Sequence, residues 1–154
     1  MTPDGGGRAL WSTGALMVVR AAGDTSTLVD LQAAPGYETP LHVHGVEDEQ
    51  LYVLDGEIEC VHGDDGAERP RAGSHDSVHL PRGVPHGFRV VGDDPLRMVA
   101  MVTPGGLETF FEAVGEPAPA HELPPPAEPD DEAMAELTTL AGEYDLEILG
   151  PLPA

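Results

Sequence analysis

Short apolar runs alternate with turn-forming residues over most of this chain, from Ala9 to about Thr103. Several of these runs have the length and the Val, Ile and Leu content of β-strands (15–21, 26–32, 50–54, 57–62, 76–80, 86–91 and 96–102). Glycine, proline and aspartate separate them, as in Pro35-Gly36 and Asp55-Gly56. Many short strands with turns between them predict an all-β fold, either a sandwich or a closed barrel.

The pattern changes to a helical one after Pro104. Apolar residues recur three and four positions apart, which is the spacing of one helix face, at Leu107, Phe110, Phe111 and Val114. Gly115 is placed to end this helix as a C′ glycine. A second helix is predicted from Asp130 to Gly142, because acidic residues fill its first turn and suit the helix dipole.

These patterns divide the chain into three parts. We expect a disordered N-terminus over residues 1–8, a β-barrel with its following helix over 9–115, and a proline-rich linker with an acidic C-terminal helix over 116–154. The last part has acidic residues but no Lys or Arg. We interpret its charge as the solvated outer face of a docked helix.

Composition narrows the possible partners and location. With 7 basic and 28 acidic residues the formal charge is −21, which argues against nucleic acid and anionic membranes, since both need clustered cations. The single cysteine, Cys60, cannot form an intrachain disulfide. The start of the chain has no pattern of a secretory signal, and no apolar run approaches the roughly 18 residues of a membrane span. We therefore expect a cytoplasmic location.

Two histidines lie one residue apart in the stretch 35–56. In a strand, His42 and His44 would point to the same face, which is the arrangement that a metal needs. The fixed positions of this stretch are Gly36-x5-His42-x-His44-x4-Glu49-x6-Gly56. This spacing resembles the first conserved motif of the cupin family at all five positions.

A second cupin-like motif lies further along the chain, where Pro81-Arg82-Gly83 leads to His86. It departs from the family pattern at two positions, since His75 stands where the family has glycine and Val90 where it has asparagine. Neither position is a metal ligand in the family. The departures therefore concern the local turn and some hydrogen bonding.

The chain also resembles a narrower group, the small single-domain cupins similar to quercetin 2,3-dioxygenase. The resemblance covers roughly residues 10–152 and rests on HVHGVEDEQLYVLDGE, LPRGVPHGF, TPGGLETFFEAVGEP and, more weakly, EYDLEILGPLP. It implies a single jelly-roll-like β-barrel with a short helical C-terminal extension. It also implies a metal site with three histidines and one glutamate, at His42, His44, His86 and Glu49.

That ligand set suits one divalent transition metal per chain, which could be Fe, Mn, Ni, Co, Cu or Zn. It leaves coordination positions open, as a catalytic site needs. The alternative is a group of polar histidines at a barrel mouth without a metal. Of the neighbouring acids, only Glu49 has the motif spacing and precedes an apolar strand, so we expect Glu47 and Asp48 to be solvated turn residues.

The remaining candidates are weaker. His79 could point into the barrel as a hydrogen-bond donor behind the ligands, or outward at an interface. We expect His62 to be exposed, His75 to lie in a turn, and His121 to lie in the linker. Cys60 is expected to be a small buried hydrophobic residue. The possible pocket walls, each also a plausible core residue, are Trp11, Tyr37, Tyr52, Phe88, Met17, Met98 and Met101.

The resemblance favours a metal-dependent dioxygenase that acts with O2 on a phenolic or enolisable ring, with Glu49 as the base. One alternative is a non-redox cyclase, isomerase or decarboxylase of a polyketide-like or other secondary metabolite. Another is a small-molecule-binding cupin without turnover, since fold alone does not settle activity. The resemblance also implies a homodimer, and Met134, Leu137 and Leu140 of the second helix need a surface on this barrel or a partner's.

Overall fold

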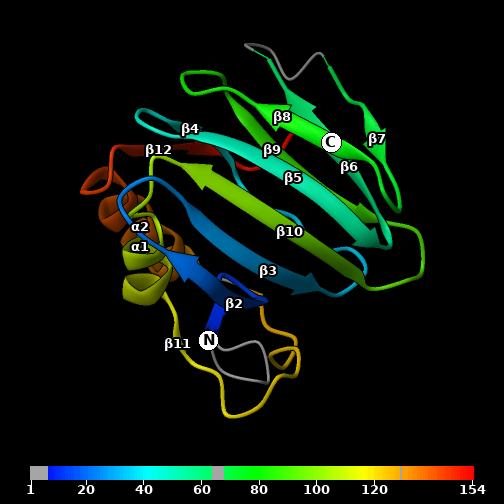
Figure 1. Cartoon of the computed structure of the whole chain (residues 1–154), viewed down its shortest axis with the longest axis horizontal. Helices are drawn as coiled ribbons and strands as arrows, with labels where there is room; N and C mark the ends of the chain where they lie inside the picture. The colour runs from blue at the N-terminus through cyan, green and yellow to red at the C-terminus, as the bar shows by residue number, and fades with distance from the viewer. Residues whose placement is uncertain (1–6, 64–67, 129) are drawn as a thin grey trace.

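The computed structural model describes residues 7–63, 68–128 and 130–154. Two antiparallel sheets face each other (Figure 1). The larger has the strand order β11 (Glu116–Pro117), β1 (Arg8–Ser12), β2 (Ala15–Ala22), β3 (Thr27–Ala33), β10 (Leu96–Thr103), β5 (Asp48–Asp55) and β8 (Ser77–Leu80). The smaller has the order β12 (Leu146–Gly150), β4 (Leu41–His44), β9 (His86–Val91), β6 (Glu57–His62) and β7 (Arg71–Ala72). The predicted all-β fold is confirmed.

Alternation along the strands builds the core between the sheets. In β10, for example, Leu96, Met98 and Ala100 are buried, whereas Arg97 and Met101 face solvent. Successive side chains of a strand point to opposite faces, so one sequence supplies both the core and the surface. Buried side chains from both sheets form one apolar cluster between them.

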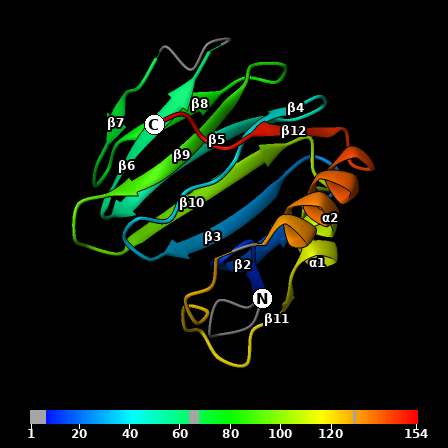
Figure 2. The ribbon, with the colours of Figure 1, turned by 180° about the vertical axis from the view of Figure 1, so that it is seen from behind.

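The two helices pack together at one end of the sheets, beside β12 (Figures 1 and 2). They are α1 (Glu108–Val114) and α2 (Asp131–Gly142), and the Asp130 side chain caps α2 by accepting a hydrogen bond from the Ala133 backbone N–H. Leu107 and Phe110 are buried in a second apolar cluster, against which Leu137 and Leu140 pack. The apolar face of α2 is therefore partly covered within its own chain.

Gly115 ends α1 for a different reason from the predicted one. Its φ of −112° and ψ of −172° are extended, not left-handed. A Cβ at this position would lie 2.8 Å from the backbone oxygens of Trp11 and Phe111 and from the Cβ of Ser12. Glycine is needed here for close packing against β1 and not for a C′ conformation.

The C-terminal segment contains a strand that the sequence did not predict. β12 pairs with β4, with Leu146 opposite His44 and Ile148 opposite His42. The predicted third part of the chain is thus joined by a sheet ladder to the part that carries the histidine motif. Of the predicted disordered residues 1–8, residues 1–6 lie outside the described ones, and Arg8 begins β1.

No helix among the described residues is long and apolar enough to cross a membrane.

Candidate metal centre

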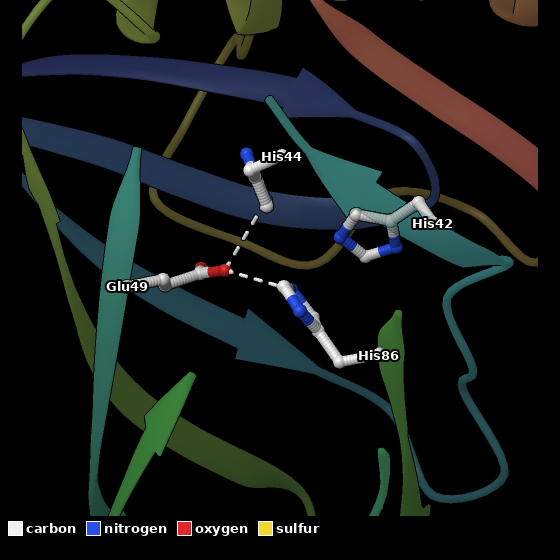
Figure 3. Close-up of side chains that lie close together, drawn as sticks. All are labelled: His42, His44, Glu49 and His86. Carbon is white, nitrogen blue, oxygen red and sulfur yellow. Dashed lines mark hydrogen bonds and ion pairs between the residues drawn. The ribbon is translucent and has the colours of Figure 1, made fainter. Parts of the chain in front are cut away.

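Three strands bring the four predicted ligands together. His42 and His44 lie on β4, Glu49 on β5 of the opposite sheet, and His86 at the start of β9. His42 is directly opposite His86 in the β4–β9 pair. Figure 3 shows the Glu49 carboxylate pointing toward the rings of His44 and His86. Its Oε2 lies 3.4 Å from His44 Nε2 and 3.2 Å from His86 Nε2.

Backbone carbonyls orient two of the rings. His42 Nδ1 lies 2.8 Å from the Pro40 carbonyl oxygen, and His86 Nδ1 lies 3.2 Å from the Val84 carbonyl oxygen. A carbonyl can only accept a hydrogen bond, so each Nδ1 must carry the proton and donate it. On His42 this tautomer leaves the lone pair of Nε2 free, whereas His86 Nε2 lies within hydrogen-bond distance of the Glu49 carboxylate.

The charges within the cluster are strongly coupled. Burial, and then the nearby charges of His86 and His44, lower the pKa of His42 to about 3, so this ring is neutral. Burial also acts to lower the pKa of His44, but Glu47 and Glu49 outweigh it and raise this pKa to about 9. Burial acts to raise the pKa of Glu49, yet hydrogen bonds to His44 and His86 hold it far below its usual range. Glu49 is therefore an ionised carboxylate.

The expectation for Glu47 was wrong. Its side chain is buried, with 7% of the residue exposed, and its Oε2 lies 3.4 Å from His44 Nδ1. Asp48 is half-buried, and its carboxylate accepts hydrogen bonds from the backbone and the guanidinium of Arg82. Because Gly83 N–H also donates to the His44 carbonyl, the loop that leads to His86 is hydrogen-bonded to both β4 and β5.

The remaining histidines lie outside the cluster. His79 is exposed on β8 opposite Gln50, which rules out the inward alternative. His62 is half-buried with Nε2 3.5 Å from a Glu68 oxygen, and not exposed as expected. His75 has a φ of 71°, the left-handed conformation that favours glycine, so the turn keeps its shape despite the departure from the motif. His121 is exposed.

Cys60 is fully buried, as predicted, and burial raises the pKa of its thiol to about 12.

A largely apolar cavity lies against the cluster. It holds about 820 Å³ of empty space, including its opening to solvent. Tyr37, Phe88, Met17 and Met98 line it, as the sequence suggested. Tyr52 and Met101 instead face solvent, with 41% and 36% of their surface exposed. Trp11 is outside the lining, and its indole N–H donates to the Glu122 carbonyl.

The helical extension also contributes to the cavity wall, which the sequence did not reveal. Phe110 of α1, Leu137 of α2, and Leu146 and Ile148 of β12 all line the cavity. The signal available in the sequence was the alternation of Leu146 and Ile148 with the acidic Glu147, which is typical of a half-buried strand.

The cluster fits a metal ion. One atom from each of the four side chains can be chosen so that all lie within 4.8 Å of one another. Imidazole and carboxylate donors lie about 2.0–2.2 Å from a first-row metal, so two donors of one ion are at most about 4.4 Å apart. The four atoms therefore need to approach by only a few tenths of an ångström. Imidazole and carboxylate together suit Fe, Mn, Co, Ni, Cu or Zn.

The fold and the cluster define an antiparallel β-barrel protein with a buried three-histidine, one-glutamate group able to bind a metal. Residues 30–102 match the family model of the cupin domain. The chain belongs to the cupin superfamily, as the motif spacing predicted.

Known relatives agree on the fold but differ in activity. Over 124 residues, or 79% of this chain, the sequence is 34% identical to quercetin 2,3-dioxygenase of Bacillus subtilis (strain 168). The match covers 36% of that protein, so the chain spans little more than a third of its relative.

Two solved structures extend the comparison. A conserved protein with a double-stranded beta-helix domain from Klebsiella pneumoniae is 27% identical, with a TM-score of 0.55 over 60% of this chain and 74% of that one. A cupin-superfamily sugar phosphate isomerase from Silicibacter pomeroyi DSS-3 is 21% identical, with a TM-score of 0.51 over 58% of this chain and 59% of that one. At that identity the isomerase shows the shared fold alone.

Proposed function

We propose that this chain is a metal-dependent dioxygenase that uses O2 to open a phenolic or enolisable ring. His42, His44, His86 and Glu49 are its metal ligands, and Glu49 is also the base. The observation that carries the proposal is the position of these four side chains on the wall of a largely apolar cavity. The 34% identity to a quercetin 2,3-dioxygenase supports the reaction class.

The cavity lining favours an uncharged substrate. None of the seven arginines lines the cavity, and all seven lie within the residues that the structure describes. A phosphorylated or carboxylated substrate would find no arginine there, so the metal would be its only cationic partner. Besides the ligand cluster, the polar lining residues are Thr13, Tyr37 and Thr39. This wall suits a ring compound with a few oxygen atoms better than a sugar phosphate.

Glu49 is suited to take a proton from the substrate. Its carboxylate is ionised and lies beside the cavity, and because the hydrogen bonds of His44 and His86 hold its pKa low, it becomes an effective base only when it leaves them. The three histidines would hold a bound ion, which would leave Glu49 to accept the proton of a substrate hydroxyl on a carboxylate oxygen. A bound metal supplies the Lewis acidity and electron transfer that activate the deprotonated ring toward O2. The apolar walls exclude water from the reacting ring.

Oxygen labelling tests the proposal. The metal-loaded protein is incubated under ¹⁸O2 with quercetin or 3-hydroxyflavone while O2 uptake and product mass are measured. We expect one O2 consumed per substrate and both labelled atoms in the product. Turnover of either probe in the absence of O2 would replace the proposal with non-redox cyclase, isomerase or decarboxylase chemistry. No turnover by the metal-loaded protein would favour a binding protein.

We further propose a cytoplasmic homodimer. The location is supported by the single cysteine, Cys60, which is free and buried. The dimer is supported by the family resemblance. Leu137 and Leu140 of α2 are partly buried within the chain, so this helix needs a partner surface less than the sequence suggested.

A further inference from the structure

Glu47 is a buried carboxylate that the proposed reaction does not use. Its side chain is 9% exposed, and that of His44 is 4% exposed. Glu47 Oε2 and His44 Nδ1 are both buried, and neither makes a hydrogen bond within the described residues. The two atoms lie 3.4 Å apart, so each is available as the partner of the other. A buried carboxylate without a partner is costly, which makes its position beside this ring informative.

The three histidines share one arrangement, with a single difference. On His42 and His86, Nδ1 faces a backbone carbonyl oxygen. On His44, Nδ1 faces the Glu47 carboxylate. In all three rings Nδ1 therefore faces an oxygen, and on His44 and His86 the other nitrogen, Nε2, faces Glu49 (Figure 3). Only His44 has a charged acceptor.

We propose that Glu47 is a positioning residue that holds His44 by its Nδ1–H and supplies the metal centre with a second negative charge. The inference rests on the proposed metal centre. A carboxylate that accepts the Nδ1–H of a metal-binding imidazole fixes the tautomer of the ring and strengthens Nε2 as an electron-pair donor to the metal. A backbone carbonyl has the same effect, but a weaker one. Together with Glu49, Glu47 gives the pocket two negative charges, which balance one divalent cation among three neutral imidazoles.

The test is the Co²⁺ affinity of Glu47→Gln, measured at one fixed pH by chelator competition. Glutamine keeps the shape but removes the charge, and its amide can turn an N–H toward Nδ1 and so favour the wrong tautomer. We expect affinity to fall by roughly 10- to 100-fold, the usual effect of losing such a partner. Glu47→Asp keeps the charge and should recover part of the loss.

Asp55→Asn is the matched control, because Asp55 is an exposed acid at the far end of β5. It removes one negative charge and should leave Co²⁺ affinity unchanged. Affinities of wild type and Glu47→Gln that agree within about threefold would overturn the proposal, as would an equal loss in Asp55→Asn. A wild-type protein that binds no Co²⁺ would instead refute the metal centre itself.

A second measurement uses the wild-type protein and does not depend on the folding of a variant. Long-range proton–nitrogen NMR of the Zn²⁺-loaded protein reports which nitrogen of each ring carries the proton. We expect His44 to bind through Nε2 with the proton on Nδ1, shifted downfield by the carboxylate. Metal bound at Nδ1 of His44, or an Nδ1 without a proton, would overturn the role of Glu47.

Discussion

Metal binding should weaken steeply as the pH falls from 9 to 7, because a proton on His44 competes with the ion. Glu47 lies 3.4 Å from one nitrogen of this ring and Glu49 lies 3.4 Å from the other. Burial alone would lower the pKa of His44, but these two carboxylates raise it to about 9 in the metal-free protein. The proton on Nε2 occupies the lone pair that a metal requires.

The magnitude follows from that pKa. At pH 7, two units below 9, about one His44 ring in a hundred is neutral. The apparent affinity should therefore be about 100-fold lower at pH 7 than its limit above pH 9, or about 3 kcal/mol. His42 adds nothing in this range, because its pKa is about 3, and Glu49 is ionised throughout.

Metal affinity should rise with pH, whereas the free energy of unfolding of the metal-free protein should fall as the pH rises. The pKa of His44 in the folded chain, about 9, is above the ordinary value of 6.5. Its contribution to the free energy of unfolding is therefore fully present below pH 6.5 and is lost as the pH rises through 9. Metal should reverse this dependence, since the bound ion replaces the proton on Nε2.

Calorimetry of Zn²⁺ binding in buffers of different ionisation enthalpy measures the proton count. We expect about one proton from His44 to be released per ion at pH 7.5, and an affinity that rises about tenfold from pH 7 to 8 and less steeply from 8 to 9. An affinity independent of pH in this range, with no proton from His44, would show that this ring is already neutral. The electrostatic account of the cluster would then be wrong.

Three further predictions concern the base, the fold and the assembly. Glu49→Gln should keep its metal through the three histidines while kcat falls roughly 10²- to 10⁴-fold, with partial recovery at high pH, where a flavonol ionises unaided. Full activity of this variant would exclude Glu49 as the base. Loss of the metal would show that Glu49 is chiefly a ligand. Gly87→Ala should lower the free energy of unfolding, measured in urea, by about 1–3 kcal/mol, because its Cβ would lie 2.6 Å from Leu152 Cδ1 and 3.0 Å from the Pro40 oxygen. Gly142→Ala is the control, because the space around Gly142 is open. Equal urea midpoints for the two variants would contradict the close packing at Gly87. Light scattering should give twice the 16.2 kDa of one chain, and a mass of one chain at working concentration would rule out a stable dimer.

The strands of the barrel could be predicted because their pattern is local. Alternation within five to eight residues identifies β10 or β5 without knowledge of their partners. β12 was missed because it follows a helix in an acidic segment and has only two inward residues, Leu146 and Ile148. Its partner, β4, lies about a hundred residues earlier in the chain, a pairing that no local pattern reports.

The four clustered side chains could also be predicted from a local pattern, whereas the role of Glu47 beside His44 could not. The four predicted ligands have a fixed spacing within two short segments, so the motif identified the side chains that the fold brings together. The prediction that Glu47 is exposed was wrong because the burial of an acidic side chain depends on tertiary contacts, which the local sequence does not show. No strand pattern reports this burial, because Glu47 lies in the turn before β5.

The most direct test of the account is the metal content of the purified protein and of three single variants, His42→Ala, His44→Ala and His86→Ala. Elemental analysis should find close to one divalent transition metal per wild-type chain. Each variant should lose most of it, since each removes one of the donors that lie within 4.8 Å of one another. Far-UV circular dichroism of each variant should match the wild type. Unchanged metal content in all three folded variants would contradict the central claim.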